Sequence, residues 1–538
     1  MTQSEPDREW TRPVVTNSPL RRVSCDSEAS LVPLQEGHEP GHEVLVDSLQ
    51  RARFLPTLAA SLGATRVHLV DYPGSVLSLP TAQGLALVAS RSLQRKLARL
   101  PGVERLVESL WGHRLNPPWP SPEATLALAD AVAADPAPLR PGQGIAHYIG
   151  SLSAGGAERQ LSYLCEQQGG GARVYVRAPL EGEHAHHAPR LARAGVSSTY
   201  LPPLLRSRPL DLPGLSPEHR ALLERHCERE GIAPLIAALR RDPPAVLHCW
   251  LDGCNIAGAI AGLLSGVPRI VLGVRSLSPK DSPNLNQPWY RQSYASLARS
   301  ERIRICANSA AGAKDYAAWS DLGSETVSVV PNGLDVSEWS TPSPQAREET
   351  RRTLGIADDE VLVVGAFRQI EVKRPGDFLR ALAQAHQSFP RLRAIHLGSG
   401  PLEASFRAEA RSLGLDGVLQ HLGRRQDVVS LMGAADLVML CSRQEGCPNT
   451  LLEGQALGLP AITTAAGGAP EVVREGVTGF VVPVGDVEAL AERILRLAES
   501  PELRATFGAA ARSWIHERFS LEAMADAYTE LYESESEG

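Results

Sequence analysis

The chain has 538 residues, 43% hydrophobic and 21% charged, a composition typical of folded globular proteins and a length sufficient for two or three domains. Its net charge of −7, without a basic run, argues against nucleic acid as a partner. The eight cysteines are scattered without a Cys-x-x-Cys pair, which favours a reducing compartment. The polar N-terminus lacks the apolar core of a secretory signal, and no stretch reaches the roughly 18–20 apolar residues of a membrane span, so we expect a cytoplasmic protein.

The first 140 residues are expected to form a tail and an accessory region without assigned chemistry. Residues 1–40 mix charges, serine and proline without periodicity, which predicts a disordered tail. Residues 41–140 are expected to be an accessory α/β region, with helical spacing over 44–62 and 92–111 and a strand in TRVHLVDY. The region closes on a proline-rich linker around one helical piece, LNPPWPSPEATLALADAVAADPAPLRPGQG.

From Gly144 onwards, short apolar runs alternate with helical patterns. The expected strands are IAHYIG, RVYVRA, STYLP, AVLHCW, RIVLG, RIRICA and TVSVVP, then VLVVGAF, RAIHLG, VLQHLG, DLVMLC, PAITTA and GFVVPV. This alternation predicts an α/β fold with two tandem Rossmann-like doubly wound domains, over 141–340 and 341–515, followed by a final helix and tail at 516–538. Doubly wound sheets bind ligands at the carboxyl ends of their strands, so we expect the site between the two domains.

The stretch after the expected strand DLVMLC carries two carboxylates, those of Glu445 and Glu453, eight positions apart. Between them stand Gly446, Cys447, Pro448, Asn449, Thr450 and two leucines. Pro448 suits the first turn of a helix, whose exposed amides would bind polar or anionic groups. The carboxylates, one in the loop and one in the helix, could accept hydrogen bonds from two sets of sugar hydroxyls. For an isolated pair of glutamates, a solvated loop residue and a helix-face charge would be the simpler interpretation.

Two cations follow the expected strand VLVVGAF. Arg368 ends that strand, and Lys373, one of only four lysines in the chain, comes five residues later. Cations at a strand end would stabilise a diphosphate leaving group, and the guanidinium could also bind it in a bidentate manner. The alternative is that both are surface charges. No Asp-x-Asp motif occurs, so neither a metal nor another cofactor is implied.

Glycine turns follow three of the expected strands, in SLSAGGAE, HLGSGPLE and AAGGAPE. Gly155 and Gly156 in SLSAGGAE would let the backbone approach a phosphate or a sugar, although a tight turn alone is the alternative. Gly398 and Gly400 in HLGSGPLE face the same site. The third glycine of a dinucleotide fingerprint is replaced there by Glu403, which argues against an NAD enzyme.

The segment EGCPNTLLEGQALGLPAITTAAGGAPEVVREGVTGFVVPVGD resembles the nucleotide-sugar site of glycosyltransferase family 4, retaining enzymes with the two-Rossmann GT-B fold. The resemblance extends over about residues 144–530. It implies that Glu445 contacts the transferred sugar, that Glu453 holds the donor ribose, and that Arg368 and Lys373 serve the diphosphate. It also implies that the final helix crosses back onto the first domain. Phe367 departs from the family, which usually has glycine before the arginine.

The first domain offers three candidates for the acceptor or sugar side, namely His248, Trp250 and Arg275. Family members often place a histidine near the reacting sugar, and Trp250 and Arg275 stand where relatives carry one. His248 fits a packed strand histidine better than a catalyst. Arg275 could hold a donor phosphate or an acidic acceptor, or pair structurally.

The resemblance implies a retaining glycosyltransferase of polysaccharide biosynthesis that uses a nucleotide diphosphate sugar, with UDP favoured over GDP, and a glycan or lipid-linked acceptor. Peripheral contact with the inner face of the plasma membrane is a further hypothesis. Two alternatives stay open: a sugar phosphorylase or synthase on the same scaffold, and a catalytically degenerate protein that acts as a binding or regulatory module.

Overall fold

The computed structural model describes residues 43–46, 66–71, 75–80, 122–204, 210–226, 229–282 and 285–534. The chain divides into two units, Met1–Pro117 and Pro118–Gly538. The first contains a three-stranded sheet in the order β1 (Glu43–Val46), β2 (Arg66–Asp71) and β3 (Ser75–Pro80). β2 falls within the expected strand TRVHLVDY. The helix expected from residue 44 is wrong at its start, because residues 43–46 pair in parallel with β2. The expected tail (1–40) and the helix at 92–111 lie outside the described residues.

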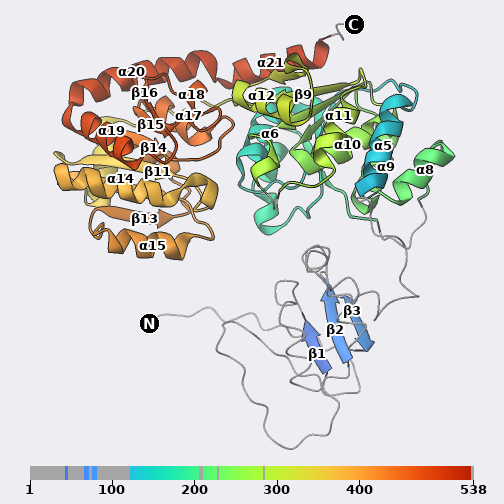
Figure 1. The fold of residues 1–538 in the computed structure, drawn as a ribbon, viewed down its shortest axis with the longest axis horizontal. Helices are drawn as coiled ribbons and strands as arrows, with labels where there is room; N and C mark the ends of the chain where they lie inside the picture. The colour runs from blue at the N-terminus through green and yellow to red at the C-terminus, as the bar shows by residue number, and fades with distance from the viewer. Residues whose placement is uncertain are drawn as a thin grey trace, which may run out of the picture. The chain divides into compact units, whose positions relative to one another are not determined.

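The second unit begins with a domain built on a seven-stranded parallel sheet (Figure 1). The strands lie in the order β10-β9-β8-β7-β4-β5-β6. They are β4 (Ile145–Ile149), β5 (Ala172–Val176), β6 (Ser197–Tyr200), β7 (Val246–Trp250), β8 (Arg269–Val274), β9 (Ile303–Ala307) and β10 (Val327–Val329). The helices are α5 (Pro122–Ala134), α6 (Gly156–Gln168), α7 (Ala188–Arg193), α8 (Pro217–Glu224), α9 (Arg229–Arg241), α10 (Asp252–Ser265), α11 (Tyr290–Leu297) and α12 (Ala310–Trp319).

A second domain contains a six-stranded parallel sheet in the order β13-β12-β11-β14-β15-β16. Its strands are β11 (Val361–Ala366), β12 (Leu392–Leu397), β13 (Leu419–Gly423), β14 (Leu437–Leu440), β15 (Ala461–Thr464) and β16 (Gly479–Val482). Its helices are α13 (Pro344–Leu354), α14 (Pro375–Ser388), α15 (Glu403–Ser412), α16 (Val428–Gly433), α17 (Asn449–Ala456), α18 (Ala469–Val472), α19 (Val487–Glu499) and α20 (Pro501–Arg518). The predicted pair of doubly wound α/β domains is thereby confirmed.

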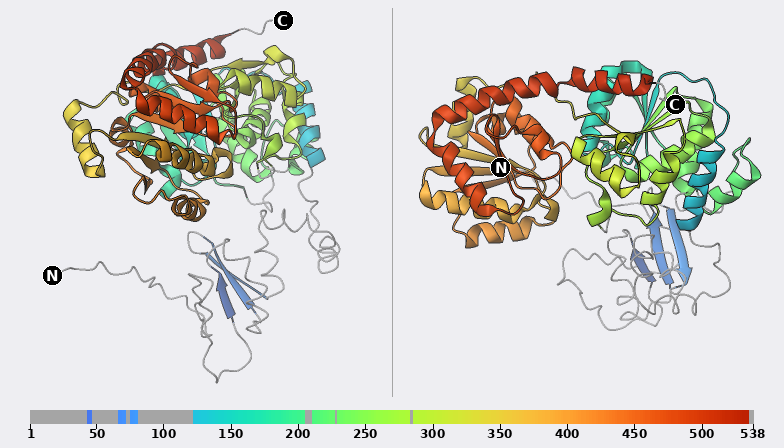
Figure 2. Two further views of the ribbon diagram at one scale, coloured as in Figure 1. Left: turned by 60° about the vertical axis from the view of Figure 1, so that its left-hand side comes forward. Right: turned by 45° about the horizontal axis from the view of Figure 1, so that its top comes forward.

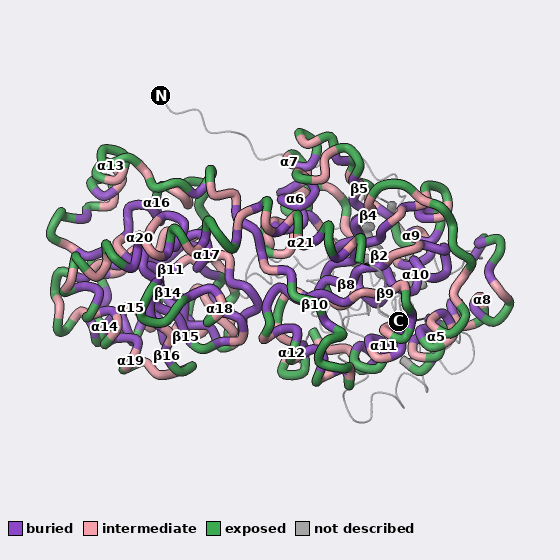
Figure 3. The backbone as a smooth tube through the Cα atoms, turned by 90° about the horizontal axis from the view of Figure 1, so that it is seen from above, coloured by how far each residue is buried: buried purple, intermediate pink, exposed green. Residues whose placement is uncertain are grey.

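The central strands of both sheets are buried and mostly apolar, whereas the edge strands β6, β10 and β13 are partly exposed (Figure 3). β7 shows the principle: Leu247 and Cys249 belong to the core on one face of the sheet, while Val246 and Trp250 belong to the core on the other. This division follows from the two-residue period of a strand. The order of the strands then leaves each sheet one switch point, between β4 and β7 and between β11 and β14.

Two helices tie the ends of this unit to the first of its domains. α5 lies within the stretch that we expected to be a linker, yet Leu128, Ala129 and Val132 are fully buried in the same core as β7, because they share one helix face. At the other end, α21 (Leu521–Glu533) leaves the second domain after α20 and packs against α6 of the first (Figures 1 and 2). Met524 and Tyr528 of α21 are buried in the first domain's core.

Candidate active site

The switch point of the second domain brings together the two loops that carry the predicted site residues. β11 and β14 are parallel neighbours, so the loops after Ala366 and Leu440 start at the same edge of the sheet. The amide of Arg443 donates a hydrogen bond of 2.8 Å to the carbonyl of Val372, which joins the two loops directly. Ligands of doubly wound sheets bind at this position.

Glu445 and Lys373 meet at this edge. The Lys373 ammonium lies 2.5 Å from Oε1 of Glu445, and the Ser442 hydroxyl donates to the same oxygen at 2.5 Å. Glu445 is buried, with 7% of the residue exposed, whereas the Lys373 side chain is 24% exposed. A buried carboxylate held by a cation and a hydroxyl is compensated for its loss of water, and the cation remains accessible.

Arg368 lies in the same loop with an exposed side chain. Phe367 before it is buried, and its ring packs edge-on against those of Phe378 and His396 at centroid distances of 5.3 and 4.4 Å. The departure from the family at this position is therefore a core contact. It fixes the end of β11 and leaves the Arg368 side chain directed outward.

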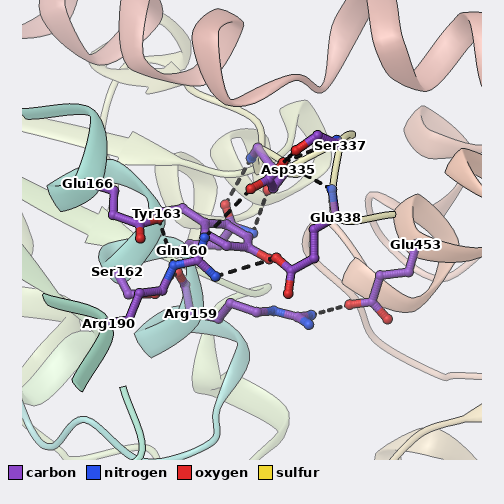
Figure 4. Close-up of polar contacts among 11 residues, drawn as sticks. Arg159, Gln160, Ser162, Tyr163, Glu166, Arg190, Asp335, Ser337, Glu338 and Glu453 are labelled. Carbon is purple, nitrogen blue, oxygen red and sulfur yellow. Dashed lines mark hydrogen bonds and ion pairs between the residues drawn. The ribbon is translucent and has the colours of Figure 1, made fainter. Parts of the chain in front are cut away.

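Glu453 is also buried, and its partner comes from the other domain. Arg159, in the first turn of α6, donates from Nη2 to Oε1 of Glu453 (Figure 4). The two side chains are 27% and 5% exposed, respectively. Burial alone would lower the pKa of the Arg159 guanidinium, but the neighbouring charge of Glu453 raises it above its usual value. Arg159 was not among the candidate site residues of the sequence, because nothing local indicates its contact with Glu453.

The loop from Gly446 to Asn449 contacts the first domain. Asn332 donates from Nδ2 to the carbonyl of Cys447 at 2.8 Å and to Oδ1 of Asn449 at 2.7 Å. A Cβ on Gly446 would lie 2.3 Å from Oδ1 of Asn308, so only glycine allows this approach. Burial raises the pKa of the Cys447 thiol to about 12, so it stays protonated. These residues therefore join the two domains.

The start of α17 differs slightly from the expectation. Pro448 is the residue before the helix, with φ −74° and ψ 111°, and the helix begins at Asn449. Thr450 donates its hydroxyl to the carbonyl of Ala366 at 2.6 Å. This bond anchors the helix that carries Glu453 to the end of β11.

The glycines of the predicted turns contact different parts of the chain. A Cβ on Gly398 would meet the carbonyl of Phe367 at 2.2 Å, and one on Gly400 would meet that of Gln369 at 2.4 Å. Both glycines thus let the loop after β12 pack on the loop that carries Arg368. Gly155 and Gly156 lie at the start of α6. A Cβ on Gly156 would be 3.1 Å from the side-chain nitrogen Nδ2 of Asn449. Of these four glycines, Gly156 approaches a residue of the other domain.

His248 and Trp250 do not face this site. His248 is a packed strand histidine, the interpretation that the sequence favoured, whereas for Trp250 this corrects the candidate place on the acceptor side. Both are 0% exposed, because alternation along β7 turns them into the core under α21. Nδ1 of His248 is 2.8 Å from the Tyr532 hydroxyl, and its ring stacks on Trp250 at 4.4 Å. Burial is the main cause that holds the pKa of His248 well below its usual value.

Arg275 belongs to the same structural cluster. Its Nη1 donates to the Tyr528 hydroxyl at 2.9 Å, its Nη2 donates to Oδ1 of Asn332, and its guanidinium lies 5.1 Å from the Trp250 ring centroid. These contacts favour the structural alternative for Arg275. Through Asn332, Arg275 also supports the loop that holds Cys447 and Asn449.

Glu471 is a second contact between the domains that the sequence reading missed. It lies in α18, and its carboxylate accepts hydrogen bonds of 2.7 and 2.8 Å from the amides of Ala310 and Ala311. These amides open α12 of the other domain, where a negative charge is favourable. The only local signal for Glu471 and Asn332 is a neighbouring glycine-containing segment, AGGAPE and VPNG respectively.

Within the described part of the chain, no group of three or more histidine, cysteine, aspartate or glutamate side chains could hold a metal ion. No helix among the described residues is both long and apolar enough to cross a membrane.

Comparison with known proteins matches both domains to glycosyltransferase models. Residues 154–338 match the family described as Glycosyltransferase Family 4, and residues 346–514 match Glycosyl transferases group 1. The chain is 30% identical over 415 residues to the Vi polysaccharide biosynthesis protein VipC/TviE of Salmonella typhi, covering 72% of this chain and 71% of that protein. It is 31% identical over 215 residues to a GDP-mannose-dependent mannosyltransferase of Corynebacterium glutamicum, covering 38% of this chain and 56% of that enzyme.

Among solved structures, the chain resembles Anabaena Alr3699/HepE in complex with UDP, with a TM-score of 0.61 and 23% identity over 72% of this chain and 99% of that one. A glycosyltransferase from Rickettsia africae matches with a TM-score of 0.59 and 16% identity, over 73% and 98% of the two chains. At these identities the comparison shows the shared GT-B fold. The family models and the Salmonella relative show that the chain is a glycosyltransferase and belongs to the glycosyltransferases of group 1.

Proposed function

We propose that this glycosyltransferase retains the configuration of the sugar that it transfers, and that it takes the sugar from a nucleotide diphosphate donor, with UDP favoured over GDP. The acceptor is a glycan or a lipid-linked glycan of polysaccharide biosynthesis. The observation that carries the proposal is the pairing of Lys373 with the buried Glu445 at the switch point of the second domain. The relative named for Vi polysaccharide biosynthesis supports the acceptor class.

In this proposal, each residue at the strand ends has one task. Glu445, fixed by Lys373 and Ser442, accepts hydrogen bonds from the transferred sugar. Arg368 and Lys373 stabilise the diphosphate as the glycosidic bond breaks, because positive charge near a leaving group favours the transition state more than the ground state. Glu453 binds the donor ribose. The two cations make a divalent metal unnecessary, so activity is expected to survive chelation with EDTA.

The acceptor is proposed to lie at the carboxyl edge of the first sheet. Since the burial of His248 and Trp250 removes them from that edge, no histidine of β7 is available there as a general base. The donor's own leaving phosphate is proposed to take the acceptor proton, as the resemblance to retaining enzymes implies. Contact with the inner face of the plasma membrane stays part of the proposal, and liposome co-sedimentation that is insensitive to anionic lipid would count against it.

Thermal unfolding with nucleotides tests the donor site. Purified protein is heated with UDP, GDP and ADP and with their sugars, beside a Glu453→Ala variant. We expect one nucleotide to raise the melting temperature of the wild type and to lose that effect in the variant, because ligand binding stabilises the folded state by mass action. A Glu338→Ala variant is the matched control, since this glutamate is 46% exposed and lies beside the same network.

The outcomes separate the parts of the proposal. A shift with UDP alone fixes the donor class, and a shift with GDP alone moves the donor to the second choice. Equal shifts in wild type and Glu453→Ala would show that the ribose is held elsewhere. If no nucleotide shifts the wild type, the assigned donor site is wrong.

A further inference from the structure

The turn between β7 and α10 consists of a single strained residue. β7 ends at Trp250 and α10 begins at Asp252, so Leu251 alone connects them. The Leu251 backbone has φ 71° and ψ 151°, a combination that is essentially confined to glycine. A leucine in this conformation stores strain, because its Cβ crowds the neighbouring backbone.

Hydrogen bonds from several sides hold this turn in place. The Leu251 amide donates to the carbonyl of Gly273 at 3.0 Å, and the Leu251 carbonyl accepts from the amide of Asn255 at 2.8 Å. The next residue, Asp252, accepts hydrogen bonds of 2.9 and 2.8 Å from tyrosine hydroxyls of α11 and α12. Strained residues persist only where the surrounding structure fixes them in this way, and they cluster at functional sites.

The strained turn keeps a leucine side chain at the surface. Leu251 is 39% exposed, although glycine would adopt the same backbone without strain. A sharp turn from a strand into a helix presents its residue above the edge of the sheet, the geometry that exposes the nucleophile in α/β hydrolases. Leu251 has no reactive atom, so its side chain can serve only through contact with an apolar surface.

Leu251 stands at the switch point of the first sheet. β4 and β7 pair with Tyr148 opposite Cys249, so Gly150 comes level with Leu251 two residues later. A Cβ on Gly150 would meet no described atom within 4 Å, so there is open space at this edge. The loop after Gly150 leads into α6, which reaches Asn449 of the second domain. Leu251 therefore lies at the same edge as the part of the first domain that contacts the proposed donor site.

We propose that Leu251 binds the acceptor sugar, with its side chain packed against the C–H face of a pyranose ring at the carboxyl edge of β7. This inference rests on the proposed function, which puts the acceptor at this edge. A pyranose combines a C–H face with hydroxyls at its rim, and an aliphatic side chain covers the face and excludes water from it. Leu251 is thus a specificity-determining residue for the acceptor.

Two variants separate the strain from the side chain. Leu251→Gly and Leu251→Ala both remove the branched end of the side chain, but only glycine also removes the Cβ. We expect the melting temperature of Leu251→Gly to lie about 2 °C above that of Leu251→Ala, because relief of strain exceeds the entropic cost of glycine. This order is the reverse of the usual one. An equal or lower melting temperature for the glycine variant would overturn the inference.

Steady-state kinetics test the acceptor role. The probes are the methyl glycosides of glucose, galactose, mannose and N-acetylglucosamine, with the nucleotide sugar that thermal unfolding selects as the donor. Release of nucleoside diphosphate above the rate of hydrolysis measures transfer. We expect KM for the best glycoside to rise about tenfold in both variants, with kcat within about twofold, because a partly exposed leucine side chain no longer covers the ring. The rise in melting temperature that the nucleotide causes should be retained.

Leu139→Ala is the matched control. Leu139 is 61% exposed and lies beside Ser265 at the other end of α10, so this variant should leave KM for the glycoside unchanged. An unchanged KM in both Leu251 variants would overturn the inference. Stimulation by octyl glucoside but by no methyl glycoside would overturn it as well, since an alkyl chain would then be the ligand, and so would donor hydrolysis that no glycoside stimulates. If the wild type neither binds a nucleotide nor hydrolyses its sugar, the proposed function fails instead.

Discussion

Replacing Lys373 with methionine tests the proposed site most directly, because one side chain is assigned both a structural and a catalytic task. Its ammonium lies 2.5 Å from Oε1 of Glu445, and the two side chains are 24% and 9% exposed. Exposed ion pairs contribute about 0–1 kcal/mol, and breaking a buried pair costs about 3–5 kcal/mol. For this intermediate case we expect Lys373→Met to lower the free energy of unfolding by about 1–3 kcal/mol.

The catalytic effect should exceed the effect on stability. Removal of one preorganised group that stabilises developing charge lowers kcat by about 10²–10³-fold, and we expect a loss of this size. The assay is release of nucleoside diphosphate from the donor by hydrolysis, which needs no acceptor. Lys373→Arg should retain more activity because it keeps the charge. Lys280→Met is the matched control, since Lys280 also pairs with a carboxylate, that of Asp315, at 2.5 Å.

One result would refute this reasoning. If Lys373→Met is folded, as judged by its circular dichroism and urea transition, and hydrolyses the donor within about threefold of wild type, Lys373 does not stabilise the leaving group. Its pair with Glu445 would then be structural only.

Three further predictions concern the packing around the site. Tyr532→Phe should destabilise the protein by about 1–3 kcal/mol in urea unfolding, because it removes the hydroxyl 2.8 Å from Nδ1 of the buried His248; an unchanged midpoint would contradict this. Burial lowers the pKa of His147 to about 4, so its contribution to stability is present above pH 6.5 and falls by about 1.4 kcal/mol per pH unit between pH 6.5 and about 4. His147→Gln should flatten urea-derived stability between pH 7 and pH 5, and an unaltered slope would exclude this histidine as the cause. Glu471→Gln should speed hydrogen–deuterium exchange at the start of α12, whose first two amides the carboxylate holds, and equal protection in both proteins would show that the charge is not needed.

The sequence by itself determined the two parallel sheets and the position of the site along them. The apolar runs and the helical periodicity are local properties, and the carboxyl ends of neighbouring strands must share one edge. Glu445 and Lys373 were each expected after a strand, at the same edge of one sheet, and the strand order of the structure then brings them into contact.

Only the tertiary structure decided which side chains from distant parts of the chain meet. The sequence contains no local sign that Arg159 reaches Glu453, because that contact joins two domains. Nor does it show that α21 covers His248, since alternation defines two faces of a strand but not what packs on each. The helix expected from residue 44 also failed at its start for a tertiary reason. Apolar spacing over a few residues fits both a helix and a strand, and the pairing with β2 selects the strand.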